Sequence, residues 1–306
     1  MVFRSGPVAP GIAFVTGGAR GLGNAIGVSF AKEGARGVCL VDIQDEATFE
    51  EGKKAVEKYG AKVLCIRADV TREEDVERAV NEAVKEFGRI DYAANFAGII
   101  GPLGETWDTD TDQWRRVIEV NTVGVWLCNK YELKQMMKQD SIEVEEGRPR
   151  QRGSIVNCAS VNSIQAGAGT TGYTASKHAV AGLTKAVSKS PSPLDFNPDH
   201  RVFLPSLYPH HHNTFFPSQA ALEARRHDIR INAVSPGFLL TKLLDPFMKQ
   251  GNGELAAKAW EEYEARQGRK ATFDEIGDVV VLLSTPRMSL VVGHNLVIDG
   301  YVTSGA

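Results

Sequence analysis

TGGARGLG, Thr16 to Gly23, lies between a short apolar run and a helical pattern that extends from Leu22 to Glu33. Gly17, Gly21 and Gly23 allow the backbone to turn tightly and to approach a ligand. The N-terminus of the following helix offers free N–H groups and the positive end of its dipole to a pyrophosphate. The stretch therefore predicts a strand–turn–helix unit that binds a dinucleotide.

A carboxylate follows this turn at the end of the next apolar run. Asp42 lies about 20 residues further on, where it can accept hydrogen bonds from both ribose hydroxyls of an adenosine. The same carboxylate would repel a 2′-phosphate, so we expect NAD(H) rather than NADP(H), although Arg20 could reach a phosphate. In the alternative interpretation, the glycines serve helix packing only and Asp42 caps the next helix. Asp69 can contact the adenine amino group or cap the helix that begins near Arg72, and both possibilities stay open.

Short apolar runs alternate with longer helical patterns along the whole chain. This alternation predicts βαβ units and an α/β fold, a doubly wound, mostly parallel sheet of about seven strands of the Rossmann type. The runs are continuously apolar, as expected for strands buried on both faces. With no repeat and no linker, we expect a single domain over 1–306. The expected strands are 11–17, 37–43, 62–70, 90–98, 154–160, 229–237 and 295–300; the expected helices are 22–33, 45–59, 72–87, 110–139, 275–284 and one that begins near Gly172, and 140–153 is expected to be a solvated loop.

Composition argues against several classes of partner. The net charge of −3 and the pI of about 6.2 give no overall attraction to nucleic acid or to an anionic membrane. No stretch has the length of a secretory signal or of a membrane span, which predicts a cytoplasmic protein. The cysteines, Cys39, Cys65, Cys128 and Cys158, are widely separated, so we expect reduced thiols and no metal site.

Three side chains suited to acid–base chemistry lie close together in the chain. Tyr173 and Lys177 are four residues apart at the start of a helical pattern, so both project from one face. A cation beside a phenol favours the phenolate form, which suits the phenol to proton transfer. Ser160 ends the preceding strand, at the carboxyl edge of the sheet where ligands of α/β proteins bind. Its hydroxyl can donate a hydrogen bond to a substrate carbonyl.

The combination of these motifs resembles the classical short-chain dehydrogenase/reductase family, from about Gly11 to the C-terminus. TGGARGLG matches its cofactor loop, and NFAG (95–98) nearly matches its Asn-Asn-Ala-Gly. Phe96 replaces the second Asn, for which we expect weaker local hydrogen bonding rather than lost activity. The other matching residues are Asn121, Ser160, Tyr173, Lys177 and, in SPGFLLT, Pro236, Gly237 and Thr241.

The resemblance implies hydride transfer between a nicotinamide cofactor and a secondary alcohol or ketone. Tyr173 would be the acid/base, Lys177 would bind the nicotinamide ribose, and Ser160 would orient the carbonyl. Asn121 would hold a water linked to Lys177, and Thr241 would meet the carboxamide. Cofactor contacts are expected from Gly17, Arg20, Gly21, Leu22, Gly23, Asp42, Asp69, Val70, Asn95, Ala97, Gly98, Tyr173, Lys177, Pro236, Gly237 and Thr241.

The helix that carries Tyr173 and Lys177 is interrupted. Residues 187–219 are rich in Pro, have no helical or strand period, and contain three consecutive His residues at 210–212. Joining Ala186 to Ala220 restores one uninterrupted helical pattern, so we expect an irregular insertion. A retained intron is one explanation, since the end codons can match splice sites. A true insertion, a lid or an arm for assembly, is the other.

We expect specificity to depend partly on a substrate lid at 239–270, whose apolar residues suggest a medium-sized or hydrophobic alcohol or ketone. These residues can equally form a packed helical segment. Family members commonly pair through the helices of Asn121 and Tyr173, so we expect a homodimer or homotetramer if the insertion permits it. Two alternatives remain: a protein that binds NAD without turnover, and a splice product with impaired activity.

Overall fold

The computed structural model describes residues 6–187, 224, 227–239, 258, 261–262 and 264–303. Thr241, the His residues at 210–212, nearly all of the expected insertion at 187–219 and most of the expected lid at 239–270 lie outside these residues.

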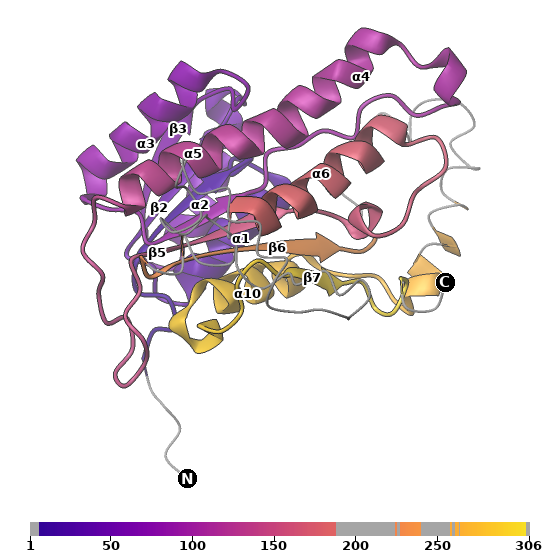
Figure 1. Cartoon of the computed structure of the whole chain (residues 1–306). Helices are drawn as coiled ribbons and strands as arrows, with labels where there is room; N and C mark the ends of the chain where they lie inside the picture. The colour runs from indigo at the N-terminus through magenta and orange to yellow at the C-terminus, as the bar shows by residue number, and fades with distance from the viewer. Residues whose placement is uncertain are drawn as a thin grey trace, which may run out of the picture.

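A parallel sheet forms the centre of the molecule (Figure 1). Its seven described strands have the order β3-β2-β1-β4-β5-β6-β7, and every neighbouring pair is parallel. The order reverses between β1 and β4, which is where ligands of doubly wound folds bind. The predicted α/β fold is confirmed. The strands are β1 (Ile12–Thr16), β2 (Gly37–Asp42), β3 (Lys62–Arg67), β4 (Tyr92–Asn95), β5 (Gly153–Cys158), β6 (Ile229–Pro236) and β7 (Asn295–Ile298).

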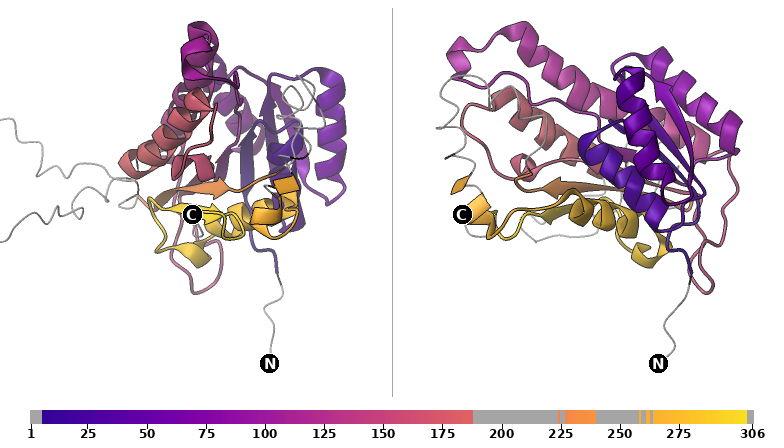
Figure 2. Two further views of the ribbon diagram at one scale, coloured as in Figure 1. Left: turned by 90° about the vertical axis from the view of Figure 1, so that its right-hand side faces the viewer. Right: turned by 180° about the vertical axis from the view of Figure 1, so that it is seen from behind.

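Helices cover both faces of the sheet (Figure 2). One face packs against α1, α2 and α10, and the other against α3, α5 and α6. The helix bounds are α1 (Gly21–Lys32), α2 (Glu46–Glu57), α3 (Glu73–Phe87), α4 (Thr111–Ile118), α5 (Gly124–Met136), α6 (Thr171–Val187) and α10 (Phe273–Ser284); the short turns are η1 (Thr106–Asp108), η2 (Glu119–Val123), η3 (Val161–Ser163) and η5 (Pro286–Met288).

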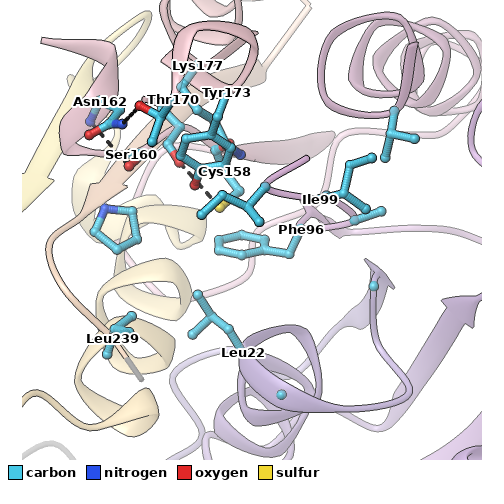
Figure 3. Close-up of a pocket in the computed structure, with 18 of the residues that line it drawn as sticks. Leu22, Phe96, Ile99, Cys158, Ser160, Asn162, Thr170, Tyr173, Lys177 and Leu239 are labelled. Carbon is cyan, nitrogen blue, oxygen red and sulfur yellow. Dashed lines mark hydrogen bonds between the residues drawn. The ribbon is translucent and has the colours of Figure 1, made fainter. Parts of the chain in front are cut away.

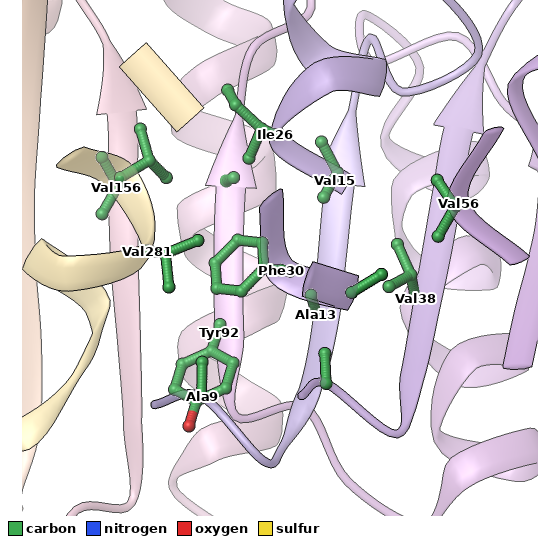
Figure 4. Close-up of a cluster of buried hydrophobic side chains, with 14 of the residues drawn as sticks. Ala9, Ala13, Val15, Ile26, Phe30, Val38, Val56, Tyr92, Val156 and Val281 are labelled. Atoms are coloured by element: carbon green, nitrogen blue, oxygen red, sulfur yellow. The ribbon is translucent and has the colours of Figure 1, made fainter. Parts of the chain in front are cut away.

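The central strand β1 supplies side chains to both cores. Ala13 and Val15 belong to the cluster under α1 and α10, whereas Phe14 belongs to the cluster on the other face. Figure 4 shows the first cluster, in which Phe30 of α1 stacks on Tyr92 of β4 with ring centroids 5.3 Å apart. Because both faces are covered, all five residues of β1 are buried, which explains its continuously apolar sequence.

The predicted helix at 110–139 consists of three pieces. The helix α4 begins after Asp110, whose carboxylate accepts a hydrogen bond from the backbone N–H of Gln113 at 2.9 Å. The π-helical turn η2 then separates α4 from α5, and Asn121 lies in this turn. Such turns insert one extra residue into a helix and frequently lie at functional sites. The helical prediction is correct over 111–136, where the three pieces follow one another without a gap, but the change to π-helical geometry at η2 was not predicted.

The connector 140–153 is more ordered than the solvated loop that its charged sequence predicted. Ile142 pairs with Gln151 in an isolated antiparallel bridge. The Gln151 side chain is only 4% exposed, donates to the Ser284 carbonyl and accepts from Arg230. The predicted solvated loop is therefore wrong at the C-terminal end of the connector, because the partners of Gln151 lie on β6 and α10.

In the part of the chain that the structure describes, none of the helices has the length and apolar character needed to cross a membrane.

Candidate active site

A cavity of about 1050 Å³ opens at the carboxyl end of the sheet. It is lined by the turns that follow β1 to β6, so residues far apart in sequence meet there (Figure 3). Of the residues predicted to contact a cofactor, the described ones that line it are Gly17, Arg20, Gly21, Leu22, Gly23, Asp42, Asp69, Val70, Ala97, Gly98, Tyr173, Lys177, Pro236 and Gly237.

The glycines of the first turn are required by close backbone contacts. Gly17 has φ +67, and a Cβ there would lie 2.9 Å from the backbone N of Ala97. A Cβ at Gly23 would collide with the carbonyl of Gly17. The chain therefore packs tightly just before α1, whose first turn contains no acidic residue. This arrangement leaves the helix N-terminus electrostatically suited to an anion.

Asp42 lies beside this turn on the cavity wall. Its carboxylate accepts hydrogen bonds from the backbone N–H groups of Ala19 at 3.1 Å and Ile43 at 2.8 Å. The cap of α2 is Asp45, which accepts from the Thr48 N–H at 2.9 Å. The alternative in which Asp42 caps the next helix is therefore wrong.

Asp69 lies on the cavity wall beyond β3. Its carboxylate accepts from the N–H and hydroxyl of Thr71 and from Arg116 at 3.3 Å. Burial alone would raise the pKa of Asp69, but these hydrogen bonds bring it below its usual value. The carboxylate of Asp69 bonds to Thr71, which precedes α3, and to Arg116, and to no N–H of α3, so Asp69 does not cap this helix.

Asn95 is not among the residues that line the cavity. Its amide nitrogen donates to Glu132 at 3.0 Å and to Asn157 at 3.1 Å, and the side chain is 1% exposed. Asn95 therefore joins β4 to β5 and α5 inside the core rather than facing a ligand. Its partner Glu132 was not predicted, because a single acidic residue in a helical pattern carries no sign of burial.

Phe96 contributes an apolar side chain to the cavity (Figure 3). The backbone N–H groups of Phe96 and Ala97 donate to the Thr16 hydroxyl at 3.1 and 3.3 Å. Thr16 therefore supplies hydrogen bonds to the backbone after β4, where the replacement of Asn by Phe96 led us to expect weaker hydrogen bonding. At Gly98, a Cβ would lie 3.2 Å from Asn121 Oδ1 and 3.9 Å from Lys177 Nζ, so this glycine keeps space beside both groups.

Ser160, Tyr173 and Lys177 come together on one wall of the cavity (Figure 3). Lys177 is 4% exposed; its Nζ donates to the Cys158 carbonyl at 2.8 Å and lies 5.4 Å from the centroid of the Tyr173 ring. Ser160 Oγ accepts from the Asn162 N–H at 3.2 Å, which leaves its own proton available to a ligand. The arrangement can therefore hold an oxygen atom and exchange a proton with it.

Asn121 lies behind this wall and is fully buried. Its amide nitrogen donates to the Ile99 carbonyl at 2.8 Å and to Ser176 Oγ at 3.0 Å, while its oxygen accepts from the Ile99 N–H at 2.9 Å. The Ser176 hydroxyl donates to the Tyr173 carbonyl at 2.7 Å. Asn121 therefore ties η2 to the loop after β4 and to the start of α6. Ser176 was missed, although its position three residues after Tyr173 places it on the adjacent helix face.

The described part of the cavity beyond these polar groups is largely apolar. A set of aliphatic side chains from the loops after β4, β5 and β6 lines it. Further polar side chains come from Gln44, Arg116, Asn162, Gln165, Thr170 and Arg266. The aliphatic residues are Ile99, Ile100, Leu103, Val161 and Leu239.

Two family models match the sequence. The model described as short chain dehydrogenase matches residues 11–193, and the model described as Enoyl-(Acyl carrier protein) reductase matches residues 217–303. Zerumbone synthase of Zingiber zerumbet is 33% identical, with 94% of this chain and 93% of that protein covered. (+)-Borneol dehydrogenase 2 of Salvia officinalis is 31% identical, with coverages of 96% and 89%.

Solved structures show the same relationship. The crystal structure of levodione reductase superimposes with a TM-score of 0.78 at 31% identity, covering 97% of this chain and 99% of that one. Sequence, fold and site thus agree along nearly the whole chain. The protein belongs to the short-chain dehydrogenase/reductase family of oxidoreductases.

Proposed function

We propose that the protein is an NAD(H)-dependent oxidoreductase that interconverts a secondary alcohol and a ketone. The observation that carries this proposal is the convergence of Ser160, Tyr173 and Lys177 on the same cavity as the glycine turn and Asp42. A proton-transfer group and a nucleotide cradle in one cavity are what this reaction needs.

The residues fit a bound dinucleotide. A Cβ at Gly17 or Gly23 would clash with neighbouring backbone, so these glycines allow the tight turn before α1. The N-terminus of α1 would then receive the pyrophosphate. Asp42 is fixed by two backbone N–H groups and retains lone pairs for ribose hydroxyls. Its negative charge would disfavour a 2′-phosphate, which supports NAD(H) over NADP(H) despite the nearby Arg20.

Ala97 and Gly98 would flank the adenosine side, and Lys177 would bind the nicotinamide ribose. One Nζ proton of Lys177 is used by the Cys158 carbonyl, which leaves two for ribose hydroxyls. The bound cofactor supplies the carbon that accepts or releases the hydride. Thr241, Pro236 and Gly237 are proposed to complete the nicotinamide end.

Tyr173 would exchange the proton. Its hydroxyl has no hydrogen bond to any residue that the structure describes, and the positive charge of Lys177 lies 5.4 Å from its ring. With no hydrogen bond to another described residue, the Tyr173 hydroxyl can take a proton from an alcohol or return one to the oxygen of a ketone. Ser160 would donate a hydrogen bond to the same oxygen and so orient it. Asn121, through Ser176, would keep the start of α6 in place.

The apolar lining supports a neutral, mainly hydrophobic substrate. The names of the relatives point the same way, because borneol dehydrogenase and zerumbone synthase are named after hydrophobic ring compounds. We therefore propose a cyclic secondary alcohol or ketone as substrate, with the segment 239–270 as part of its binding site. A homodimer or homotetramer and a cytoplasmic location are proposed on sequence grounds alone.

The segment 187–219 is proposed to be an insertion into the catalytic helix. The two family models leave 194–216 unmatched, which supports this interpretation. Sequencing the gene and its transcripts tests the intron explanation: splice-donor and acceptor codons at the two ends would support it, and their absence would exclude it. If the segment impairs function, a chain without it should turn over faster than the full chain.

The test of the proposed function is an assay of the purified full-length chain. We expect loss of NADH absorbance with cyclic ketones, gain with the corresponding alcohols, and weaker binding of NADPH than of NADH. Asp42→Ala should narrow the difference between the two cofactors. Absence of NADH binding to the full chain and to the chain without 187–219 would contradict the proposal.

A further inference from the structure

Gln267 makes a two-point contact with the turn that follows β6. Its side-chain oxygen accepts from the Phe238 N–H at 2.7 Å, and its side-chain nitrogen donates to the Phe238 carbonyl at 3.2 Å. The same nitrogen donates to the Arg269 carbonyl at 3.2 Å, and the residue is 7% exposed. The primary amide therefore matches both backbone polar groups of Phe238, as a neighbouring strand would.

Two glycines leave the space that Gln267 occupies. A Cβ at Gly237 would collide with Gln267 Oε1, and a Cβ at Gly300 would collide with the Gln267 carbonyl and lie 3.0 Å from its Cγ. The contact is thus built from three segments, the turn after β6, the turn after β7 and the residues before α10. A side chain packed this closely has little freedom to move.

Gln267 does not itself line the cavity, but the residues that it fixes do. Pro236, Gly237, Phe238 and Leu239 are all cavity residues, and so is Arg266, its neighbour in sequence. Leu239 is 8% exposed and belongs to the same apolar cluster as Leu22 at the start of α1 (Figure 3). The position of this turn therefore sets one wall of the cavity opposite the glycine turn.

A second glutamine, Gln139, makes a similar two-point contact with a backbone residue, but at the amino-terminal end of the strands. Gln139 accepts from the Ile90 N–H at 2.8 Å and donates to the carbonyls of Ile90 at 2.9 Å and Arg152 at 3.1 Å. It is also 7% exposed. Ile90 precedes β4, whereas Phe238 follows β6, so only the Gln267 contact lies at the cavity. Substitution of Gln139 therefore serves as a control, because it removes a similar stabilising contact at a distance from the cavity.

We propose that Gln267 is a positioning residue for the nicotinamide end of the cavity, holding the Pro236–Leu239 turn in the geometry that binds the cofactor. This inference rests on the proposed function. Loss of the side-chain amide would leave the Phe238 N–H and carbonyl without these partners, and the turn would shift. Misplacement of a binding wall by about 1 Å can lower the rate about 100-fold. The adenosine end, held by Asp42 and the glycine turn, would not change.

The experiment compares Gln267→Leu with Gln139→Leu in the full chain. Urea unfolding should show a loss of stability in both variants, because each loses one hydrogen bond accepted from a backbone N–H and two donated to backbone carbonyls; Gln139→Leu also loses the bond from Gln135 at 3.3 Å. For Gln267→Leu we expect the Kd of NADH, followed by nicotinamide fluorescence, to rise between about 10- and 100-fold, because a buried N–H and a buried carbonyl lose their partners. The Kd of ADP should stay within about twofold of the wild-type value. Gln139→Leu should leave both dissociation constants unchanged.

A second variant retains the shape of the side chain. Gln267→Glu cannot donate to the Phe238 carbonyl when ionised, but a protonated carboxyl can. We expect the ionised carboxylate at pH 8 to weaken NADH binding relative to wild type, as Gln267→Leu does. Unchanged NADH binding in Gln267→Leu, an equal loss of ADP binding, or the same defect in Gln139→Leu would overturn the inference. Failure of the wild-type protein to bind NADH would instead count against the proposed function.

Discussion

Glu132 is a fully buried acid on α5 without a cationic partner among the described residues. Burial raises the pKa of its carboxyl to about 8, and the hydrogen bond from Asn95 only partly offsets this. Its second oxygen, Oε1, has no hydrogen-bond partner in the described part of the chain. Glu132 is therefore mostly neutral in the folded protein at neutral pH, and ionised once the chain unfolds.

This difference predicts a pH-dependent stability. The unfolded carboxyl titrates near about 4.3, so between that pH and about 8 the folded state binds the extra proton. The contribution of the Glu132 proton to the free energy of unfolding is fully present below about pH 4.3 and is lost as the pH rises through about 8. In urea unfolding from pH 5 to 8, the stability of Glu132→Gln relative to wild type should rise by about 1.4 kcal/mol per pH unit.

Glu51→Gln, at an exposed position on α2, is the control and should show no such trend. A stability difference between Glu132→Gln and wild type that stays constant over this pH range would show that Glu132 is already ionised in the folded protein.

At the scale of elements, the turn η2 and the helix α6 are joined by a short hydrogen-bond chain. Asn121 donates to the Ser176 hydroxyl, which donates to the Tyr173 carbonyl. The start of α6 is therefore held both by its own backbone and by η2. Because Tyr173 lies in this first turn, the chain positions its ring relative to Lys177 and Ser160.

Ser176→Ala breaks this chain without touching the cavity. We expect a loss of stability of about 1 kcal/mol and a fall in kcat, with the KM for NADH nearly unchanged. Ser284→Ala is the matched control: its hydroxyl is also buried and donates within α10 to the Val280 carbonyl at 2.7 Å. Thermal unfolding and steady-state kinetics distinguish the two, since equal kinetic effects would mean that the Ser176 link has no specific role.

At the scale of the whole molecule, Arg230 joins segments far apart in the chain. It is 5% exposed, and its guanidinium donates to the carbonyls of Leu283 and Thr285 at 2.9 Å and to Gln151 at 3.0 Å. Burial lowers the pKa of Arg230 to about 10. It thereby fastens β6, the end of α10 and the connector to one another.

Arg230→Met keeps much of the side-chain volume but leaves the Leu283 carbonyl and the Gln151 side-chain oxygen without this donor, whereas the Thr285 carbonyl keeps the Met288 N–H at 3.1 Å. We expect a loss of about 3 kcal/mol of stability by urea unfolding, because several buried groups lose their partner together. Arg36→Met, at an exposed position, should change stability by less than about 0.5 kcal/mol. A similar small change in Arg230→Met would contradict the structural role assigned to Arg230.

The sequence predicted most of the fold because its signals are local. Strands buried on both faces, such as β1, are continuously apolar, and the glycine turn precedes a helix as expected. The η2 turn was not foreseen, since one extra residue hardly disturbs a helical period. The direction of Asn95 and the burial of Gln151 depend on partners 37 to 133 residues away, which no local pattern reveals. At the site, most described residues of the predicted motifs line the cavity, with Asn95 and Asn121 buried behind it, whereas the supporting residues Glu132 and Ser176 carry no motif.

The proposed NAD(H)-dependent reaction requires Tyr173 to exchange the proton. Its most direct test is single-turnover hydride transfer with wild type and Tyr173→Phe, together with NADH titrations of both. We expect nearly equal NADH affinities and a rate at least about 100-fold lower in the variant, because the phenyl ring cannot carry the proton. Equal rates in the two proteins would contradict the account.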